Sequence, residues 1–314
     1  MTTAARVNFT VDPWDPGYGL AFSDELDGGA LEESSAELNL DLEIPASQWR
    51  PLDPDPTPRL PSMVLFLDGV RRIDARIWVH GGNPQPAPGI AASLAAGLVT
   101  CDGAAHIADV TVERGLFTAA SDATDIVTSS ARYPARLAAG PGVDQLSLAL
   151  QQRLTNAEVQ LAMTYRAQHP ADDDLLIVDG PLRGRTHLDR TVGYIKTHHT
   201  TYLPAEQAAI VAALRRGQRT PAFTMGTSWR RTSWYLQLPG TPGVPWSGIV
   251  RLECSAELPP AAVTHLAGLT ARLLPPLALR LPALRLRARR PVPGLLCAGR
   301  GGQDGRESRR RLGA

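Results

Sequence analysis

Lysine is nearly absent from this sequence of 314 residues, in which Lys196 stands beside 31 arginines. A lysine ammonium is a compact charge on a flexible stem, whereas an arginine guanidinium is a planar fork. A single lysine kept against this bias is therefore a candidate for a task that arginine does not fill. Chance survival is the alternative explanation.

Cysteines and long apolar runs are also scarce, and their scarcity excludes several classes of protein. Cys101, Cys254 and Cys297 are far apart and form no CxxC pair, so neither a disulfide framework nor a structural zinc site is expected. No apolar run reaches the roughly 18 residues that span a bilayer. The N-terminal segment lacks the pattern of a secretory signal. We therefore expect a cytoplasmic protein that does not contact membranes.

Charge is unevenly distributed along the chain, although the net charge is only +1. Residues 1–60 contain twelve acidic and three basic side chains, whereas residues 280–314 contain ten arginines and two acidic residues. Without residues 280–314, the chain has a net charge of −7, from 22 basic and 29 acidic side chains. A DNA-binding surface would therefore be a local basic patch and not a general positive field.

The segment after the acidic region has the patterns of β-strands. The apolar run in SMVLFLDG predicts a buried strand from Met63 to Asp68. The alternating segment RRIDARIWVH, residues 71–80, predicts a second strand that forms a hairpin with the first. Two more strands are expected at 92–100 and 106–113, on either side of a CDG turn.

The period then changes to that of a helix. Apolar residues recur at helical spacing from Gly142 to His169, and the apolar run LLIVDG predicts a buried strand that ends at Asp179. A GYIK segment, a helix over 205–216, three strand-like pieces and a helix over 261–273 follow. This order predicts an α/β domain with a mixed β-sheet flanked by helices.

The composition divides the chain into three parts. Residues 1–60 form an acidic arm rich in Pro and Gly, which we expect to lie over the core. Residues 61–273 form the α/β domain. Residues 274–314 form a basic tail rich in Arg and Pro that has no clean period and is expected to be disordered.

Two Asp-Gly pairs stand out as candidates for chemistry. Asp68 and Asp179 each end an apolar run, so each carboxylate is expected at the C-terminal end of a buried strand, where ligands of open α/β sheets gather. If the two strands are neighbours, the carboxylates converge and repel unless a metal ion or a proton lies between them. The alternative is that each pair only begins a turn.

Glu158 interrupts the apolar stripe of the long helix. A carboxylate on a packed face needs a cation or a metal ion. Arg153 or Arg166 offers a structural salt bridge. Otherwise Asp68, Glu158 and Asp179 form an acidic cluster for one or two Mg²⁺ or Mn²⁺ ions, which polarise a phosphodiester and activate water.

These motifs together resemble the NurA nuclease family over roughly residues 60–260. The resemblance rests on a strand ending in Asp-Gly, a helix glutamate in RLTNAEVQLA, the strand LLIVDGPL and the GYIK segment, in that order. It implies an RNase H-like fold, a homodimer, and a metal-dependent deoxyribonuclease. It also implies a role in DNA end processing and repair with a HerA-type hexameric ATPase.

The resemblance also assigns roles to single residues. Asp68, Glu158 and Asp179 match the acidic residues that bind Mn²⁺ or Mg²⁺ in the family. Lys196 is expected to contact the scissile phosphate, or else to be a surface lysine. Tyr202 is expected to match a tyrosine near the site, a role for which Tyr194 competes.

The sequence departs from the family at its C-terminal end. The family usually ends with a Pro-rich stretch whose histidine completes the metal site, whereas no histidine follows His265 here. The alternative function is therefore a weakened or inactive adaptor that binds the ATPase or DNA. A nucleotide-hydrolysing enzyme finds no support because the sequence has no GxxxxGK[ST] loop.

Overall fold

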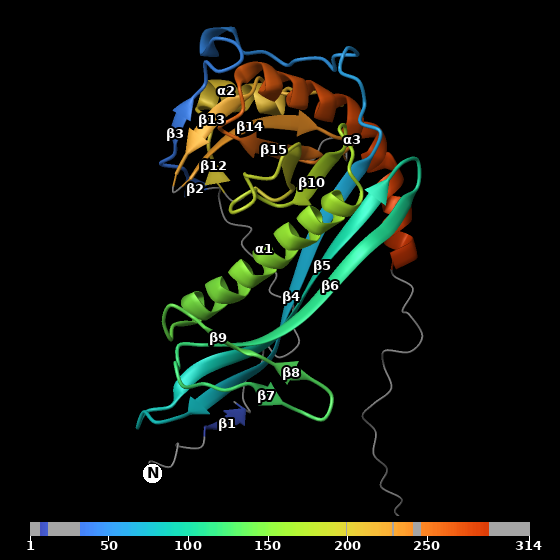
Figure 1. Cartoon of the computed structure of the whole chain (residues 1–314). Coiled ribbons are helices and arrows are strands. Elements are labelled where there is room, and N and C mark those ends of the chain that lie inside the picture. The colour runs from blue at the N-terminus through green and yellow to red at the C-terminus, as the bar shows by residue number, and fades with distance from the viewer. Residues whose placement is uncertain (1–6, 12–31, 199, 228, 241–245, 289–314) are drawn as a thin grey trace, which may run out of the picture.

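The computed structural model describes residues 7–11, 32–198, 200–227, 229–240 and 246–288. Its centre is an eleven-stranded mixed sheet in the order β3-β13-β14-β15-β11-β10-β4-β5-β6-β9, with β1 paired to β4 outside this path (Figure 1). The predicted mixed sheet flanked by helices is therefore confirmed. In the described part of the chain, no helix is long and apolar enough to cross a membrane.

Three long antiparallel strands form an extension that projects from the rest of the sheet (Figure 1). They are β4 (Val64–His80), β5 (Ala87–Cys101) and β6 (Ala105–Thr118). The hairpin predicted between residues 63–68 and 71–80 is wrong, because both segments belong to β4. Gly69 and Val70 do not turn but stay paired with Ala96 and Ala95 of β5.

Helix α1 (Val143–Gln168) covers one face of this extension (Figure 1). Its apolar stripe, which includes Leu146, Leu150 and Leu154, packs in one cluster with Leu65 and Leu67 of β4. The predicted long helix and its buried stripe are therefore confirmed. Small elements lie toward the far end of the extension: β1 (Asn8–Val11), β7 (Ile126–Val127), β8 (Arg132–Tyr133) and β9 (Ala135–Leu137).

The other half of the sheet is built around two strands that run parallel to β4. These are β10 (Leu175–Asp179), which pairs with β4, and β11 (Thr191–Ile195), which pairs with β10. The remaining strands are antiparallel: β15 (Ile249–Ser255), β14 (Arg230–Gln237), β13 (Phe223–Gly226) and β3 (Glu37–Asn39). Two short strands, β2 (Glu32–Glu33) and β12 (Thr200–Thr201), form a separate pair.

Alternate residues of β10 pack into different cores, which distinguishes the two faces of the sheet. Leu176 and Val178 belong to the cluster with α1. Leu175 and Ile177 belong to the cluster with helix α3 (Pro260–Ala288). We refer to these as the α1 face and the α3 face. Helix α2 (Ala205–Ala212) contributes Val211 to a third cluster, which contains Tyr235.

The terminal segments agree with the sequence only in part. In its described residues the N-terminal arm lies over the core, since β3 pairs with β13 and Trp49, which follows the 3-10 helix at Ala46–Gln48, is buried. Helix α3 continues to Ala288, although no regular structure was expected after residue 273. Leu273 and Leu274 are buried against the sheet, and this packing carries the helix past the following prolines. Residues 289–314 lie outside the described residues.

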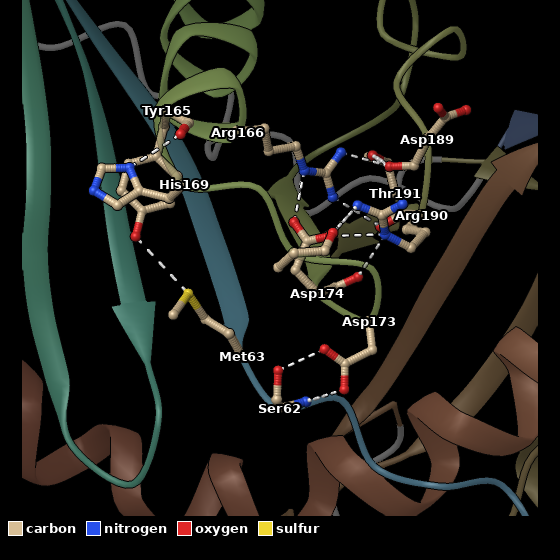
Figure 2. A network of polar contacts seen from close by, with 11 residues as sticks. Ser62, Met63, Tyr165, Arg166, His169, Asp173, Asp174, Asp189, Arg190 and Thr191 are labelled. Carbon is tan, nitrogen blue, oxygen red and sulfur yellow. Dashed lines mark hydrogen bonds and ion pairs between the residues drawn. The ribbon is translucent and has the colours of Figure 1, made fainter.

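A buried acidic residue anchors the start of β10 (Figure 2). The carboxylate of Asp174, whose side chain is 3% exposed, accepts hydrogen bonds from Arg166 Nε at 2.6 Å and Arg190 Nε at 2.7 Å. Beside it, Asp173 accepts hydrogen bonds from the backbone N–H and the hydroxyl of Ser62. The end of α1 and the starts of β4, β10 and β11 are thereby tied together.

Candidate active site

Asp68 and Asp179 lie at the positions where the two parallel strands last pair. Val178 stands opposite Leu67 in the register, so the two aspartates follow next on neighbouring strands. Burial and the nearby charge of Asp179 both raise the pKa of Asp68 above its ordinary value, although the Gly69 N–H donates to its carboxylate at 2.8 Å. The sheet therefore brings these two predicted site residues together.

Lys196 follows directly after β11, the next strand. Its Nζ donates to Asp179 Oδ2 at 2.5 Å, and both side chains are partly exposed. The Nζ atom also lies 5.8 Å from the ring centroid of Tyr194. The only lysine of the sequence therefore stands at the acidic pair.

The two aspartates point away from α1. Side chains alternate along a strand, and because Leu67 packs against α1, Asp68 points to the α3 face with Phe66. Gly69 faces α1, since a Cβ placed on it would overlap Glu158 Oε1 and come within 2.8 Å of Leu154. Asp68 and Glu158 therefore belong to opposite faces of β4.

Glu158 nevertheless lies close enough to the aspartate pair to be affected by its charge. In the described residues, β10 pairs with β4 only up to Leu67, and β1 pairs with the same strand from Ile77. Burial is the main cause that raises the pKa of Glu158, and the charges of Asp68 and Asp179 raise it further. The charges of the two aspartates therefore extend to Glu158.

The ionic partner of Glu158 is Arg185, from the loop between β10 and β11. The two side chains form an ion pair in which both are less than 8% exposed, and Arg185 is the cause that lowers the pKa of Glu158. The two partners suggested by the sequence are engaged elsewhere, since Arg153 binds Glu113 and Arg166 binds Asp174. No sequence pattern pointed to Arg185, which lies six residues after Asp179.

Tyr202 lies in a different environment from the acidic pair. Its ring covers the guanidinium of Arg251 at 4.6 Å and that of Arg231 at 5.6 Å. Burial raises the pKa of Tyr202, but hydrogen bonding and charge from Arg251, with the charge of Arg231, lower it overall. Tyr194 is the tyrosine beside the acidic pair, because it is the cross-strand neighbour of Asp179.

The donor atoms at the site suit a hard divalent cation only in part. Carboxylate oxygens are the ligands that Mg²⁺ and Mn²⁺ prefer, and Asp68 and Asp179 present them on one face. Glu158 is engaged by Arg185, and Asp179 by Lys196. Among the described residues, no three His, Cys, Asp or Glu side chains are grouped closely enough to hold a metal ion. The aspartate pair therefore offers two carboxylates to an ion, whereas Glu158 lies on the α1 face and is engaged by Arg185.

Comparisons with known proteins give little further guidance. No family model matches the sequence, and no curated protein matches it. Among solved structures, the crystal structure of the NurA nuclease from Sulfolobus solfataricus resembles the chain with a TM-score of 0.39 and 10% sequence identity, covering 71% of this chain and 76% of that one. A likeness this distant leaves the function to be argued from the residues of the site.

Proposed function

We propose that this protein is a metal-dependent deoxyribonuclease that hydrolyses phosphodiester bonds. The observation that carries the proposal is the convergence of Asp68 and Asp179 on adjacent parallel strands, where Asp179 raises the pKa of Asp68. Two carboxylates held together in this way favour a bound cation or proton. A bound Mg²⁺ or Mn²⁺ ion supplies Lewis acidity toward a phosphodiester and lowers the pKa of a bound water.

The residues of the site would divide the work as follows. Asp68 and Asp179 would hold the ion, and Glu158 would be the third oxygen donor once Arg185 releases it. Lys196, at 2.5 Å from Asp179, would place a positive charge beside the substrate phosphate. The same charge neutralises Asp179 in the structure without an ion.

The biological setting in this proposal comes from the order of the sequence motifs. A strand with Asp68, a helix with Glu158 and a strand with Asp179 occur in the order typical of NurA nucleases. The proposal therefore includes an RNase H-like core, a homodimer, and DNA end processing beside a HerA-type ATPase.

A second candidate function is a non-catalytic adaptor that binds the ATPase or DNA. Arg185 and Lys196 already neutralise Glu158 and Asp179 without a metal ion, so the acidic group is compatible with a purely structural state.

Degradation of end-labelled linear DNA with Mn²⁺, Mg²⁺ or EDTA tests the nuclease. We expect metal-dependent loss of label that falls at least about 100-fold in Asp179→Asn, because one metal ligand is removed. Asp189→Asn is the matched control, since it changes an exposed aspartate of the following loop, and it should cleave normally. If the folded protein binds DNA but does not cleave it in either Mn²⁺ or Mg²⁺, the result would support the adaptor.

A further inference from the structure

A second group of buried polar and charged side chains lies on the α1 face of β14 and β15. The proposed nuclease chemistry does not use it. The group consists of Arg231, Ser233, Arg251 and Glu253, none more than 7% exposed. Ser233 and Glu253 are direct cross-strand partners. Leu252 and Trp234, which alternate with these residues, pack on the α3 face, so the four polar side chains share the opposite face.

Each of these four residues has a buried polar atom with no hydrogen-bond partner in the described part of the chain. The atoms are Arg231 Nε, Ser233 Oγ, Arg251 Nε and Glu253 Oε2. Buried polar atoms in folded proteins are nearly always satisfied, and exceptions call for a ligand, an ion or water. Four of them on two adjacent strands show that the described residues do not satisfy this group.

The carboxylate of Glu253 is too heavily shared to satisfy both arginines. Its Oε1 accepts the backbone N–H of Leu182 at 2.6 Å. Its Oε2 lies 3.3 Å from Arg231 Nε and 3.7 Å from Arg251 Nη2, which is longer than the roughly 2.7–2.9 Å of a charge-assisted hydrogen bond.

Another buried arginine of the same protein shows what full satisfaction looks like. Arg219 binds Glu43 through two parallel hydrogen bonds of 2.8 and 2.7 Å, with side chains 7% and 9% exposed. Burial in this fold is therefore compatible with short, two-pronged pairing. The loose pairing around Glu253 is a property of that group.

The group also carries an excess of positive charge. Two guanidiniums face one carboxylate, and the ring of Trp229 lies 4.6 Å from the Arg231 guanidinium, as the ring of Tyr202 does from that of Arg251. Aromatic faces stabilise cations without neutralising them. The lowered pKa of Tyr202 agrees with a local positive potential.

We propose that Arg231, Arg251 and Ser233 bind the oxyanion of a phosphate group. A guanidinium fork matches phosphate oxygens, a serine hydroxyl is a further donor, and one negative charge would offset the excess. Glu253 orients the two arginines and joins this group to the turn after Asp179 through Leu182. The inference rests on the proposed function only in taking DNA as a source of the phosphate.

Thermal unfolding in inorganic phosphate, compared with chloride at equal ionic strength and pH, tests the oxyanion site. A ligand that binds only the folded state raises Tm, so we expect a phosphate-specific rise in the wild type. Arg251→Lys keeps the charge but removes the fork and should lose most of the rise. Arg230→Lys is the matched control, because Arg230 is exposed and precedes Arg231 in the same strand.

Ser233→Ala keeps the test valid if Arg251→Lys fails to fold. Removing a buried hydroxyl that has no partner should leave Tm in chloride unchanged or higher, while phosphate affinity falls several-fold. A purely structural serine would not combine these two effects. No phosphate-specific rise in the wild type, or a rise unchanged in the folded site variants, would overturn the proposal.

Binding of fluorescent single-stranded DNA in EDTA identifies the source of the phosphate. Equal affinity with and without a 5′-phosphate, reduced in Ser233→Ala, indicates an internal phosphodiester, whereas tighter binding of the 5′-phosphorylated strand indicates a terminal phosphate. If inorganic phosphate raises Tm but does not displace the labelled DNA, the ligand is free phosphate. Each result supports the oxyanion site. Because no metal or cleavage is involved, failure of the nuclease proposal leaves these outcomes unchanged.

Discussion

The two ends of β10 carry acidic residues in opposite circumstances. At its start, Asp174 receives two arginines, Arg166 and Arg190, at hydrogen-bonding distance. At its end, Asp179 faces Asp68, and the pKa of Asp68 is raised by burial and by this neighbour. One strand therefore begins at a carboxylate that two arginines hold, and ends at a carboxylate that a second carboxylate faces. The second arrangement is the one suited to an external ligand.

The largest effect on stability is expected at Asp174, at the start of β10. Asp174→Ala leaves two arginines without their buried partner, which should lower the free energy of unfolding by about 3 kcal/mol. Urea denaturation measures the loss. Asp173→Ala is the control, because its bonds to Ser62 are exposed to solvent and should contribute much less to stability. Equal losses in the two variants would remove the contrast between the two ends of the strand.

A smaller effect is expected from crowding the turn after Asp179. A Cβ on Gly193 would lie 2.9 Å from both Glu253 Cγ and the Gly180 carbonyl oxygen. Gly193→Ala should therefore cost about 1–3 kcal/mol and reduce DNA cleavage as Asp179 moves. Gly97→Ala, where a Cβ meets nothing within 4 Å, is the control and should be tolerated. A Gly193→Ala variant as stable and active as Gly97→Ala contradicts this role of the turn.

The smallest effect, with the opposite sign, is expected at Asp68. Its pKa is raised in the folded chain, so its contribution to stability is complete below the unfolded pKa and is lost as the pH rises through the folded value. Asp68→Asn should therefore raise Tm at pH 7 and have no effect near pH 3. Neighbouring atoms desolvate the Asp68 carboxyl, but the residue as a whole is exposed, so solvent screening limits the gain to less than about 1 kcal/mol.

An aspartate of opposite behaviour provides the control for this pH dependence. The Ala135 N–H and Arg132 hold the pKa of Asp125 below its ordinary value, so its stabilising contribution is present at neutral pH and is lost on acidification. Asp125→Asn should lower Tm at pH 7. If both variants shift Tm in the same direction at pH 7, the raised pKa of Asp68 is contradicted.

Local patterns in the sequence were sufficient to predict the strands that carry Asp68 and Asp179. The apolar runs before Asp68 and Asp179 predict buried strands, and the stripe around Glu158 predicts a buried helix face, because burial and period are properties of neighbouring residues. The turn expected at Gly69 was wrong. This glycine is required because Glu158 approaches its backbone, a contact between segments about ninety residues apart.

The partners of the charged residues were not predictable in the same way. Arg185 reaches Glu158 through the path of a loop, and Arg231 and Arg251 meet at Glu253 through the register of antiparallel strands. The spacing of apolar residues in a segment predicts neither the path of a loop nor the register of two paired strands. A signal was nevertheless present, since charged residues interrupt the apolar strand segments RRTSWYLQ and GIVRLECS, and buried charges require partners.

The continuity of β4 has a mechanical consequence. A strand of 17 residues is about 55 Å long, and it runs without a break from the core of the sheet past Asp68 to the far end of the extension (Figure 1). A pull on that end travels as tension along the covalent backbone, whereas a hairpin at Gly69 would have absorbed it by bending. Asp68 thus lies on a continuous strand that links the body of the protein to the far end of the extension.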